Sequence, residues 1–323
     1  MRSFALHLTG LAAVFAVGCF SNLTGNEGNF QFSYQADDWI TDFNKPIAPG
    51  AYLDLTVREV GTLIAVDLTA ASYDDDTVMT VDSFDGNSIT VQGVGDGTAL
   101  LSVEGTTSSG ETLTDSVNML CATPEVLVLG HTCDTAREAA YLTDQRVYLP
   151  FELQRSNGQP VIGYGYYPLT LDSEAMSMAP AESNQQWIAF DTASVAGTVV
   201  LSSDIDDTTL TADVISPDMI DDVQEPIAFV AEDIDVGDVN AFFVRPMAGG
   251  LVVCQPDVDK TVASLTPEIC AVRDTGTQPN ANYEYGWFEI EGVAEGTCLY
   301  SVTYPDGAGG EGVTAEFSYP IEP

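Results

Sequence analysis

The stretch Gly292–Val302 reads GVAEGTCLYSV, and Gly93–Val103 reads GVGDGTALLSV. A looser copy, ASVAGTVVLSS, occupies Ala193–Ser203, so the phrase recurs about every hundred residues. Similarity at a fixed period of this length indicates a repeated small domain rather than one turn of a solenoid. We therefore expect three domains of one type in tandem.

Side chains within the phrase alternate as they do in a half-buried β-strand. Ala99, Leu101 and Val103 form one row, the residues between them form the other, and the last copy keeps this phase. Short stretches of the same kind, separated by Gly, Asp and Pro turns, run through the chain. Helical signal is confined to Asp134–Leu142, where Asp134 is placed to cap a short helix. The sequence therefore predicts antiparallel β-sandwiches repeated three times.

The chain begins MRSFALHLTGLAAVFAVGCFS, a mostly apolar run after a single Arg. The run is too short to span a bilayer and is typical of an export signal. Its end, Ala16–Cys19, resembles the lipobox of bacterial lipoproteins, in which cleavage precedes a lipid-modified cysteine. The resemblance implies a signal peptide over residues 1–18, lipidation at Cys19 and a polar tether over residues 19–29. Ordinary secretion, with Cys19 discarded or free, is the alternative.

The composition is strongly acidic, with 49 Asp and Glu against 9 Lys and Arg and a formal net charge of −40. This charge opposes binding to nucleic acid phosphate and to anionic membrane surfaces, so we expect no nucleic acid partner. The simplest interpretation of the acidity is a solvated, soluble surface. A saline habitat and a calcium-rich exterior are the alternatives.

Two segments of the third repeat resemble a known family. SLTPEICAV at Ser264–Val272, followed by EGVAEGTCLYSV at Glu291–Val302, resembles bacterial immunoglobulin-like domains of the Big type. DDTVMTV at Asp75–Val81 precedes the first copy of the phrase, as in a cysteine-free version of such a domain. The second repeat departs most from the pattern, in the long aromatic stretch Gln154–Met178.

The resemblance implies an all-β chain of three tandem immunoglobulin-like sandwiches over residues 30–120, 121–222 and 223–323. It also implies a non-enzymatic lipoprotein of the bacterial cell envelope, attached to the outer membrane by its lipid, with adhesion or surface scaffolding as its role. Other envelope proteins or surface glycans are the expected partners. A carbohydrate-binding surface module and a calcium-stiffened rod are the alternative functions.

Six cysteines in an exported chain predict disulfide bonds. Aligning the repeats replaces an apolar pair of the first two repeats by Cys270 and Cys298 in the third, which favours a bond between them. Cys121 and Cys133 are expected to pair at the start of the second domain, and Cys254 to remain a buried thiol. Pairing of Cys254 with Cys270 or Cys298 is the alternative.

No catalytic site is predicted. His131 is the only histidine after the signal, and no nucleophile motif surrounds it. A metal site built from Cys121, His131 and Cys133 lacks a fourth ligand. We therefore expect neither an enzyme nor a required cofactor.

Several acidic clusters are candidate calcium sites, because loop carboxylates supply the oxygen ligands that calcium requires. The cluster near a domain junction, Asp218 with Asp221 and Asp222, is the strongest of them. None follows the twelve-residue calcium loop, and a solvated charged surface is the alternative interpretation.

Tyr164, Tyr166 and Tyr167 are candidate ligand-binding residues, since flat aromatic faces stack on sugars and protein partners. A second aromatic run spans residues 283–287. Strands commonly carry tyrosines, half of which face the core, so packing is the alternative role for both runs.

The first prediction concerns the anchor. Because Ala16–Cys19 ends the apolar run, Cys19 should be the mature N-terminus and should carry lipid. Mass spectrometry of the mature protein is expected to show an acylated N-terminal cysteine, and Cys19→Ser should move the protein to the soluble fraction. An unmodified N-terminus beyond Cys19 would rule the anchor out.

Overall fold

The computed structural model describes residues 23–34, 45–133, 138–229, 233–256, 258–277, 286–305 and 312–323. The regular secondary structure of these residues is β-strand, apart from two single-turn 3-10 helices, η1 (Pro180–Glu182) and η2 (Pro217–Met219). The all-β prediction is therefore confirmed. Within this described part, no helix has the length and hydropathy needed to cross a membrane. Cys19 lies outside the described residues.

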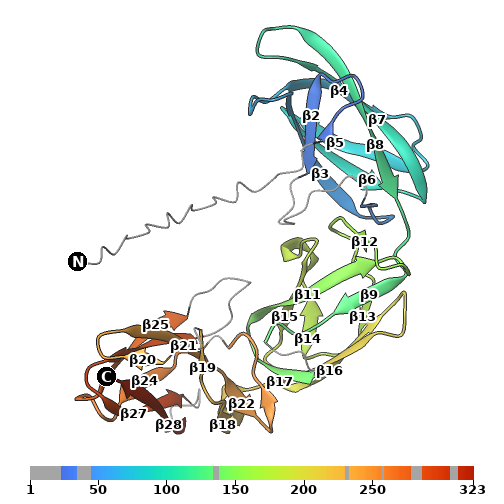
Figure 1. Cartoon of the computed structure of the whole chain (residues 1–323). Coiled ribbons are helices and arrows are strands. Elements are labelled where there is room, and N and C mark those ends of the chain that lie inside the picture. Colours follow the sequence, from blue (N-terminus) through green and yellow to red (C-terminus); the bar gives the residue numbers. More distant parts are fainter. Residues whose placement is uncertain are drawn as a thin grey trace, which may run out of the picture. The chain divides into compact units, whose positions relative to one another are not determined.

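The chain divides into two compact units, and Figure 1 traces it from blue at the N-terminus to red at the C-terminus. Unit 1 comprises residues 1–44, 53–91 and 98–120. Unit 2 comprises residues 45–52, 92–97 and 121–323, so two short segments from the first repeat belong to it.

Unit 1 contains a five-stranded sheet and a three-stranded sheet. The five-stranded sheet has the order β1 (Leu23–Thr24), β2 (Phe30–Tyr34), β3 (Tyr52–Glu59), β6 (Ser88–Gly93), β5 (Met79–Asp85). The three-stranded sheet has the order β4 (Asp67–Tyr73), β7 (Gly97–Thr106), β8 (Thr112–Cys121). Their inward rows alternate with solvated ones and form the core.

Unit 2 contains the strands of the second and third repeats. Those of the second repeat are β9 (Val126–Leu129), β10 (Glu138–Leu142), β11 (Arg146–Gln154), β12 (Pro160–Val161), β13 (Leu169–Leu171), β14 (Met176–Met178), β15 (Trp187–Thr192), β16 (Gly197–Ser203) and β17 (Thr209–Ile215). One sheet has the order β10-β17-β16-β13, and the other has the order β12-β11-β15-β14, with β9 paired to β11.

The third repeat contributes β18 (Asp222–Val223), β19 (Ile227–Ala228), β20 (Ile234–Asp235), β21 (Val239–Val244), β22 (Pro246–Ala248), β23 (Leu251–Val252), β24 (Thr261–Ser264), β25 (Cys270–Thr277), β26 (Gly286–Gly292), β27 (Gly296–Tyr304) and β28 (Val313–Glu322). They form sheets of order β19-β21-β26-β25, β20-β28-β27-β24 and β18-β22-β23.

The recurring phrase occupies the same place in all three repeats. It supplies a central strand, which is β7, β16 or β27, and each of these begins at the Gly of the Gly-Thr pair that all three copies share. The predicted inward row is buried in every copy, at Ala99, Leu101, Val103, Val199, Leu201, Cys298, Tyr300 and Val302. The phrase therefore recurs because one strand of one sandwich recurs.

A bend that is hydrogen-bonded to the start of the phrase precedes the first long strand of each repeat. A residue with positive φ donates its main-chain N–H to the carbonyl of the first residue of the phrase. The pairs are Gly50 (φ 86°) to Gly93 at 2.8 Å, Asp144 (φ 60°) to Ala193 at 3.4 Å, and Gly237 (φ 94°) to Gly292 at 2.8 Å. The bend lets the chain leave a parallel edge strand on one sheet and enter the other sheet.

Close backbone approach explains why two copies of the phrase begin with glycine. A Cβ added to Gly93 would lie 2.4 Å from the Ala48 carbonyl oxygen, and one added to Gly292 would lie 2.6 Å from that of Asp235. Both distances are shorter than any real Cβ contact, so the bend and the phrase glycine depend on each other.

The helix predicted over Asp134–Leu142 is wrong where the structure describes it. Glu138–Leu142 is β10, which pairs in parallel with β17. Ala139–Leu142 are all buried, so no face of this segment is solvated as a surface helix would require. Tertiary contacts therefore override the local helical propensity of the alanines.

A buried carboxylate ties the first hairpin of unit 1 to β8. Asp115, only 1% exposed, accepts main-chain N–H groups from Glu27 at 2.9 Å, Asn29 at 2.7 Å and Phe30 at 2.7 Å. Burial alone would raise the pKa of Asp115, but hydrogen bonds with Glu27 and from the main chain outweigh it and leave that pKa below 3.8.

The second prediction follows from this carboxylate. A depressed folded-state pKa contributes stability that is present above pH 3.8 and lost as the pH falls through the folded value. Asp115→Asn removes this contribution and mismatches the buried N–H donors, which should cost about 1 to 3 kcal/mol of unfolding free energy near neutral pH.

Denaturant unfolding between pH 3 and pH 7 checks this prediction. The stability difference between wild type and Asp115→Asn should shrink at the acid end. Asp82→Asn is the matched control, because Asp82 is exposed on β5 and should change little. A difference that is independent of pH would contradict the assignment.

Candidate functional site

The most elaborate cluster of polar contacts in unit 2 surrounds a disulfide bond between Cys133 and Cys254, which are 121 residues apart. The predicted bond between Cys121 and Cys133 is wrong. Cys121 is a free buried thiol, and its neighbours include Gly93 of the phrase loop. Spacing of 12 residues favoured a local pair, whereas the fold brings Cys254 of the third repeat to Cys133.

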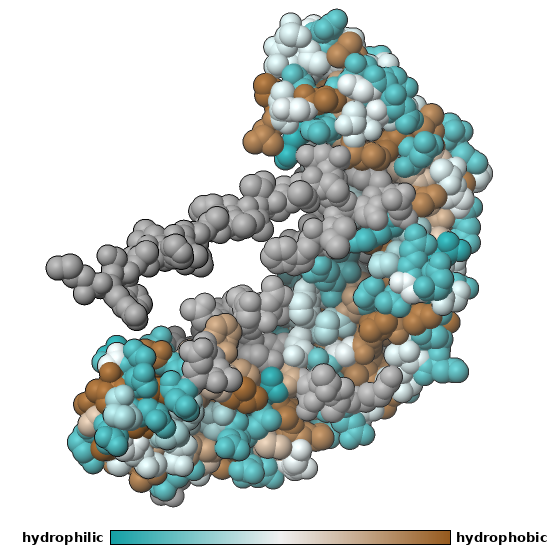
Figure 2. All heavy atoms as spheres, viewed as in Figure 1, coloured by the Kyte–Doolittle hydropathy of each residue, from teal (hydrophilic) through white to brown (hydrophobic). Residues whose placement is uncertain are grey.

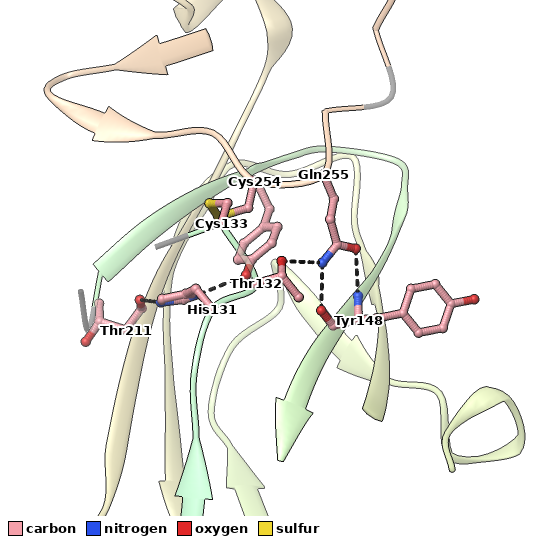
Figure 3. The surroundings of a disulfide bond; sticks show 8 residues. His131, Thr132, Cys133, Tyr148, Thr211, Cys254 and Gln255 are labelled. Carbon is pink, nitrogen blue, oxygen red and sulfur yellow. Dashed lines mark hydrogen bonds between the residues drawn. A yellow bond between two sulfur atoms is a disulfide. The ribbon is translucent and has the colours of Figure 1, made fainter. Parts of the chain in front are cut away.

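Gln255 adds a second link beside the disulfide, shown in Figure 3. Its side-chain oxygen accepts the main-chain N–H of Tyr148 at 2.9 Å. Its amide nitrogen donates to the Tyr148 carbonyl at 2.6 Å and to the Thr132 hydroxyl at 3.1 Å. Gln255 therefore occupies the hydrogen-bonding position of a neighbouring strand, in a backbone conformation with φ 48°.

Main-chain hydrogen bonding also connects the two repeats at this place. Ala140 and Val253 form a parallel β-bridge, and the N–H of Cys254 donates to the Ala140 carbonyl at 2.7 Å. Cys133, Ala140, Val253 and Cys254 are all almost fully buried. We call this set of contacts the joint: the disulfide, the Gln255 bonds and the bridge.

A hydrophobic core continues through the joint. Side chains from before residue 224, namely Ala140, Leu142, Ile215, Ile220 and Val223, belong to the cluster that also contains the core of the third repeat. The Cys270–Cys298 disulfide lies inside this cluster, in the pairing that the aligned repeats predict. Hydrophobic burial and a covalent bond therefore hold the two repeats of unit 2 together.

His131 is a structural residue beside the joint. It is 5% exposed; its Nε2 lies 3.0 Å from the Thr211 carbonyl oxygen, and its Nδ1 lies 2.8 Å from the Tyr141 hydroxyl. A carbonyl only accepts, so Nε2 carries a proton, and Nδ1 shares the second hydrogen bond with the Tyr141 hydroxyl. With both nitrogens bonded in this way, the ring is not presented to a substrate.

Cys121 is shielded from redox chemistry. Burial raises the pKa of its thiol to about 11, and the nearby Asp96 carboxylate acts in the same direction. Because the thiolate is the reactive form, Cys121 should stay reduced and unmodified in the folded protein.

The candidate ligand-binding tyrosines are half-buried rather than presented as a flat face. Tyr167 packs edge-on against Phe151, with ring centroids 5.5 Å apart, and burial raises the pKa of its hydroxyl. Tyr164 pairs its main chain with that of Tyr52, in bonds of 2.8 and 2.9 Å. Burial also raises the pKa of Tyr166, with Asp204 contributing. Residues 283–285 of the second aromatic run lie outside the described residues.

The candidate calcium ligands do not converge. Asp218 accepts the Ser216 hydroxyl, Asp221 accepts the N–H of Gly249 at 3.1 Å, and Asp222 accepts the N–H of Val223. Among the residues that the structure describes, no group of three His, Cys, Asp or Glu side chains is arranged to hold a metal. The carboxylates of this cluster instead bond to neighbouring protein groups.

The visible surface is largely hydrophilic, with apolar side chains interspersed, as Figure 2 shows. Sequence reasoning missed the joint because Cys254 aligned with a buried apolar residue of the first repeat. The hydrogen bonds of the Gln255 side chain left no sequence signal, because a glutamine in a turn is common. Five cysteines follow the predicted signal, so one of them is free in any set of two disulfides, and the sequence did not show which one.

Comparison with known proteins gives low similarities. No family model and no curated protein matches the chain. A solved structure of surface layer protein SbsC, domains 4–9, is 14% identical with a TM-score of 0.28, and the match covers 90% of this chain and 47% of that one. This chain thus spans about half of that structure.

Two further solved structures match. The Escherichia coli adhesin FdeC is 11% identical with a TM-score of 0.23, covering 91% of this chain and 97% of that one. The Bacteroides ovatus protein SGBP-B of a mixed-linkage glucan utilization locus, in complex with a heptasaccharide, is 11% identical with a TM-score of 0.27, covering 90% and 70%. Values this low assign no function to the chain.

The third prediction concerns the joint. Closing a loop of 121 residues should stabilise the folded state by about 5 kcal/mol on chain entropy alone, so the double variant Cys133→Ser/Cys254→Ser should lose roughly 2 to 5 kcal/mol. Denaturant unfolding under oxidising conditions measures this loss. Cys121→Ala is the matched control, and it should leave the redox dependence of stability unchanged.

Non-reducing peptide mapping tests the connectivity directly. It should recover Cys133 bonded to Cys254 and Cys270 bonded to Cys298, with Cys121 alkylated only after unfolding. A peptide that links Cys121 to Cys133 would contradict the joint.

Proposed function

We propose that the protein is a non-enzymatic lipoprotein of the bacterial cell envelope whose immunoglobulin-like repeats act in adhesion or envelope scaffolding. The joint is the observation that carries this proposal. It fixes one repeat to the next by a buried disulfide, a shared core and main-chain bonding. Such a connection suits a protein whose repeats must stay attached to one another when a force acts on the protein.

The joint also supports a location outside the cytoplasm. Disulfides form and persist in oxidising compartments, and both bonds of this chain are buried parts of folded cores. An export signal that ends at Cys19 would deliver the chain to such a compartment, and a lipid there would hold the acidic repeats beside a membrane that they do not bind by charge.

The polar groups in and beside the joint support a non-enzymatic role. The side chains of His131, Gln255 and Thr132 form hydrogen bonds with neighbouring protein groups. His131 is also the only histidine after the predicted signal. General acid or base catalysis requires a group that is free to exchange protons with a substrate. The tyrosines are half-buried, so they offer little free ring surface on which a sugar could stack. This favours adhesion or scaffolding over the carbohydrate-binding alternative.

The fourth prediction tests this proposal in cells. Expression of the wild type in a Gram-negative host should place the protein in the membrane fraction and should raise cell attachment or envelope resistance to osmotic shock. Cys19→Ser at equal expression should lose the membrane association and, with it, the gain in attachment or osmotic resistance. His131→Gln should retain both, because an amide can replace one of the imidazole's hydrogen bonds.

A hydrolytic activity that disappears in His131→Gln would overturn the non-enzymatic role. Retained membrane association of Cys19→Ser would overturn the anchor. Calcium-dependent melting or loss of glycan binding on Tyr166→Ala would instead favour one of the alternative functions.

A further inference from the structure

We propose that copies of this chain associate head to tail, the first repeat of one copy docking on the third repeat of the next. The two connections inside unit 2 use the same pair of segments. The first repeat exposes one member of that pair, and the third repeat exposes the other. The proposal goes beyond the anchor and the cell-envelope role.

The first segment of the pair is a docking tip, which follows the turn after β3, after β11, or after β22, the short strand that comes next after β21. The three tips are residues 62–66, 160–164 and 251–255. The second segment is a receiving edge, which runs from the parallel edge strand through the bend. The three edges are residues 46–52, 140–148 and 234–239.

The tip of the second repeat docks on the edge of residues 46–52, and both lie in unit 2. Ile162 donates its N–H to the Pro46 carbonyl at 2.8 Å and accepts the N–H of Ala48 at 3.1 Å. Tyr164 exchanges two further main-chain bonds with Tyr52. The apolar residues of this tip are buried, with Ile162 at 9% exposure.

The tip of the third repeat docks in the same way on residues 140–148. Val253 forms the parallel bridge to Ala140, and Gln255 bonds to Tyr148. Val253 and Cys254 are fully buried. The two connections therefore share their segments and a parallel main-chain bridge, Ile47 to Ile162 in one and Ala140 to Val253 in the other. They differ beyond the bridge, where Tyr164 bonds to Tyr52 through its main chain and Gln255 bonds to Tyr148 through its side chain.

The tip of the first repeat has the same local structure but is exposed. Ala65 pairs with Arg58, and the N–H of Glu59 donates to the Ile64 carbonyl at 3.0 Å, so the tip is ordered by its own strand. Leu63 is nevertheless 85% exposed and Ile64 47% exposed. Apolar side chains at this position are buried in the other two repeats.

The receiving edge of the third repeat is exposed in a matching way. Ile234 pairs with Ile321 and is buried, but Val236 is 45% and Val239 is 52% exposed. The edge carries the carboxylates of Asp235 and Asp238, and the exposed tip is flanked by Arg58, Glu59 and Asp67, so charge does not join the two segments. The free tip and the free edge match in their place within the repeat and in their exposed apolar side chains.

A second copy of the chain is the occupant that these observations favour, because each copy carries one free tip and one free edge. The contact is heterologous, so it can propagate beyond a dimer. The net charge of −40 opposes association in solution, and anchoring on a membrane would offset this by raising the local concentration.

The fifth prediction is tested by sedimentation velocity on the full chain carrying Cys19→Ser, so the result does not depend on the lipid. About 0.5 M salt shortens the Debye length to about 4 Å and screens the repulsion. This chain should form concentration-dependent dimers and larger species. Adding Leu63→Asp or Val239→Asp should each weaken association at least about tenfold.

Mixing the two variants gives the sharpest result. The Val239→Asp chain keeps an intact tip and the Leu63→Asp chain keeps an intact edge, so the mixture should form dimers and nothing larger. Val200→Asp is the matched control, because Val200 is 43% exposed on β16, away from either segment, and it should associate like the parent chain.

A parent chain that stays monomeric in high salt would overturn the proposal. So would association that survives Leu63→Asp, or a mixture that does not form dimers. Both substituted side chains are about half exposed or more, so thermal unfolding should show the variants folded and any loss attributable to the contact. Failure of this experiment would leave the anchor and the cell-envelope role standing.

Discussion

The bend before the first long strand is the constraint on which the repeated architecture depends. One N–H from a residue with positive φ meets the carbonyl that opens the phrase, at Gly50, Asp144 and Gly237. This contact allows an edge strand to pair with one sheet while its continuation belongs to the other. It also places the phrase loop against the bend, so the central strand that follows has a fixed register.

The connections between repeats are built on the outer side of the same bend. A tip from the following repeat lies along the edge that the bend creates, as Ile162 and Val253 do. The Cys133–Cys254 disulfide and Gln255 reinforce the second of these connections and continue its core through Ala140. An isolated fragment from Gln224 onward would therefore lack that part of its core.

Much of the fold could be predicted because burial alternates along strands. The phrase gave the position of a central strand and its inward row, and the swap of an apolar pair for Cys270 and Cys298 gave a disulfide. The partner of Cys133 and the partner strand of β10 could not be predicted, because Cys254 lies 121 residues from Cys133 and Thr211 of β17 lies 211 − 138 = 73 residues from Glu138 of β10. Glu138–Leu142 has helical composition, but its pairing with β17 and the burial of Ala139–Leu142 make it a strand.

The functional proposal rests on the same contacts. Repeats that are bonded to one another can hold a partner-binding surface at a fixed distance from the membrane. Amide hydrogen exchange tests this account most directly. The N–H groups of Gly50 and Gly237 should exchange as slowly as those of the core strands, and that of Asp144, at 3.4 Å, somewhat faster. Exchange at these bends as fast as in the exposed turn at Gly158 would contradict the account.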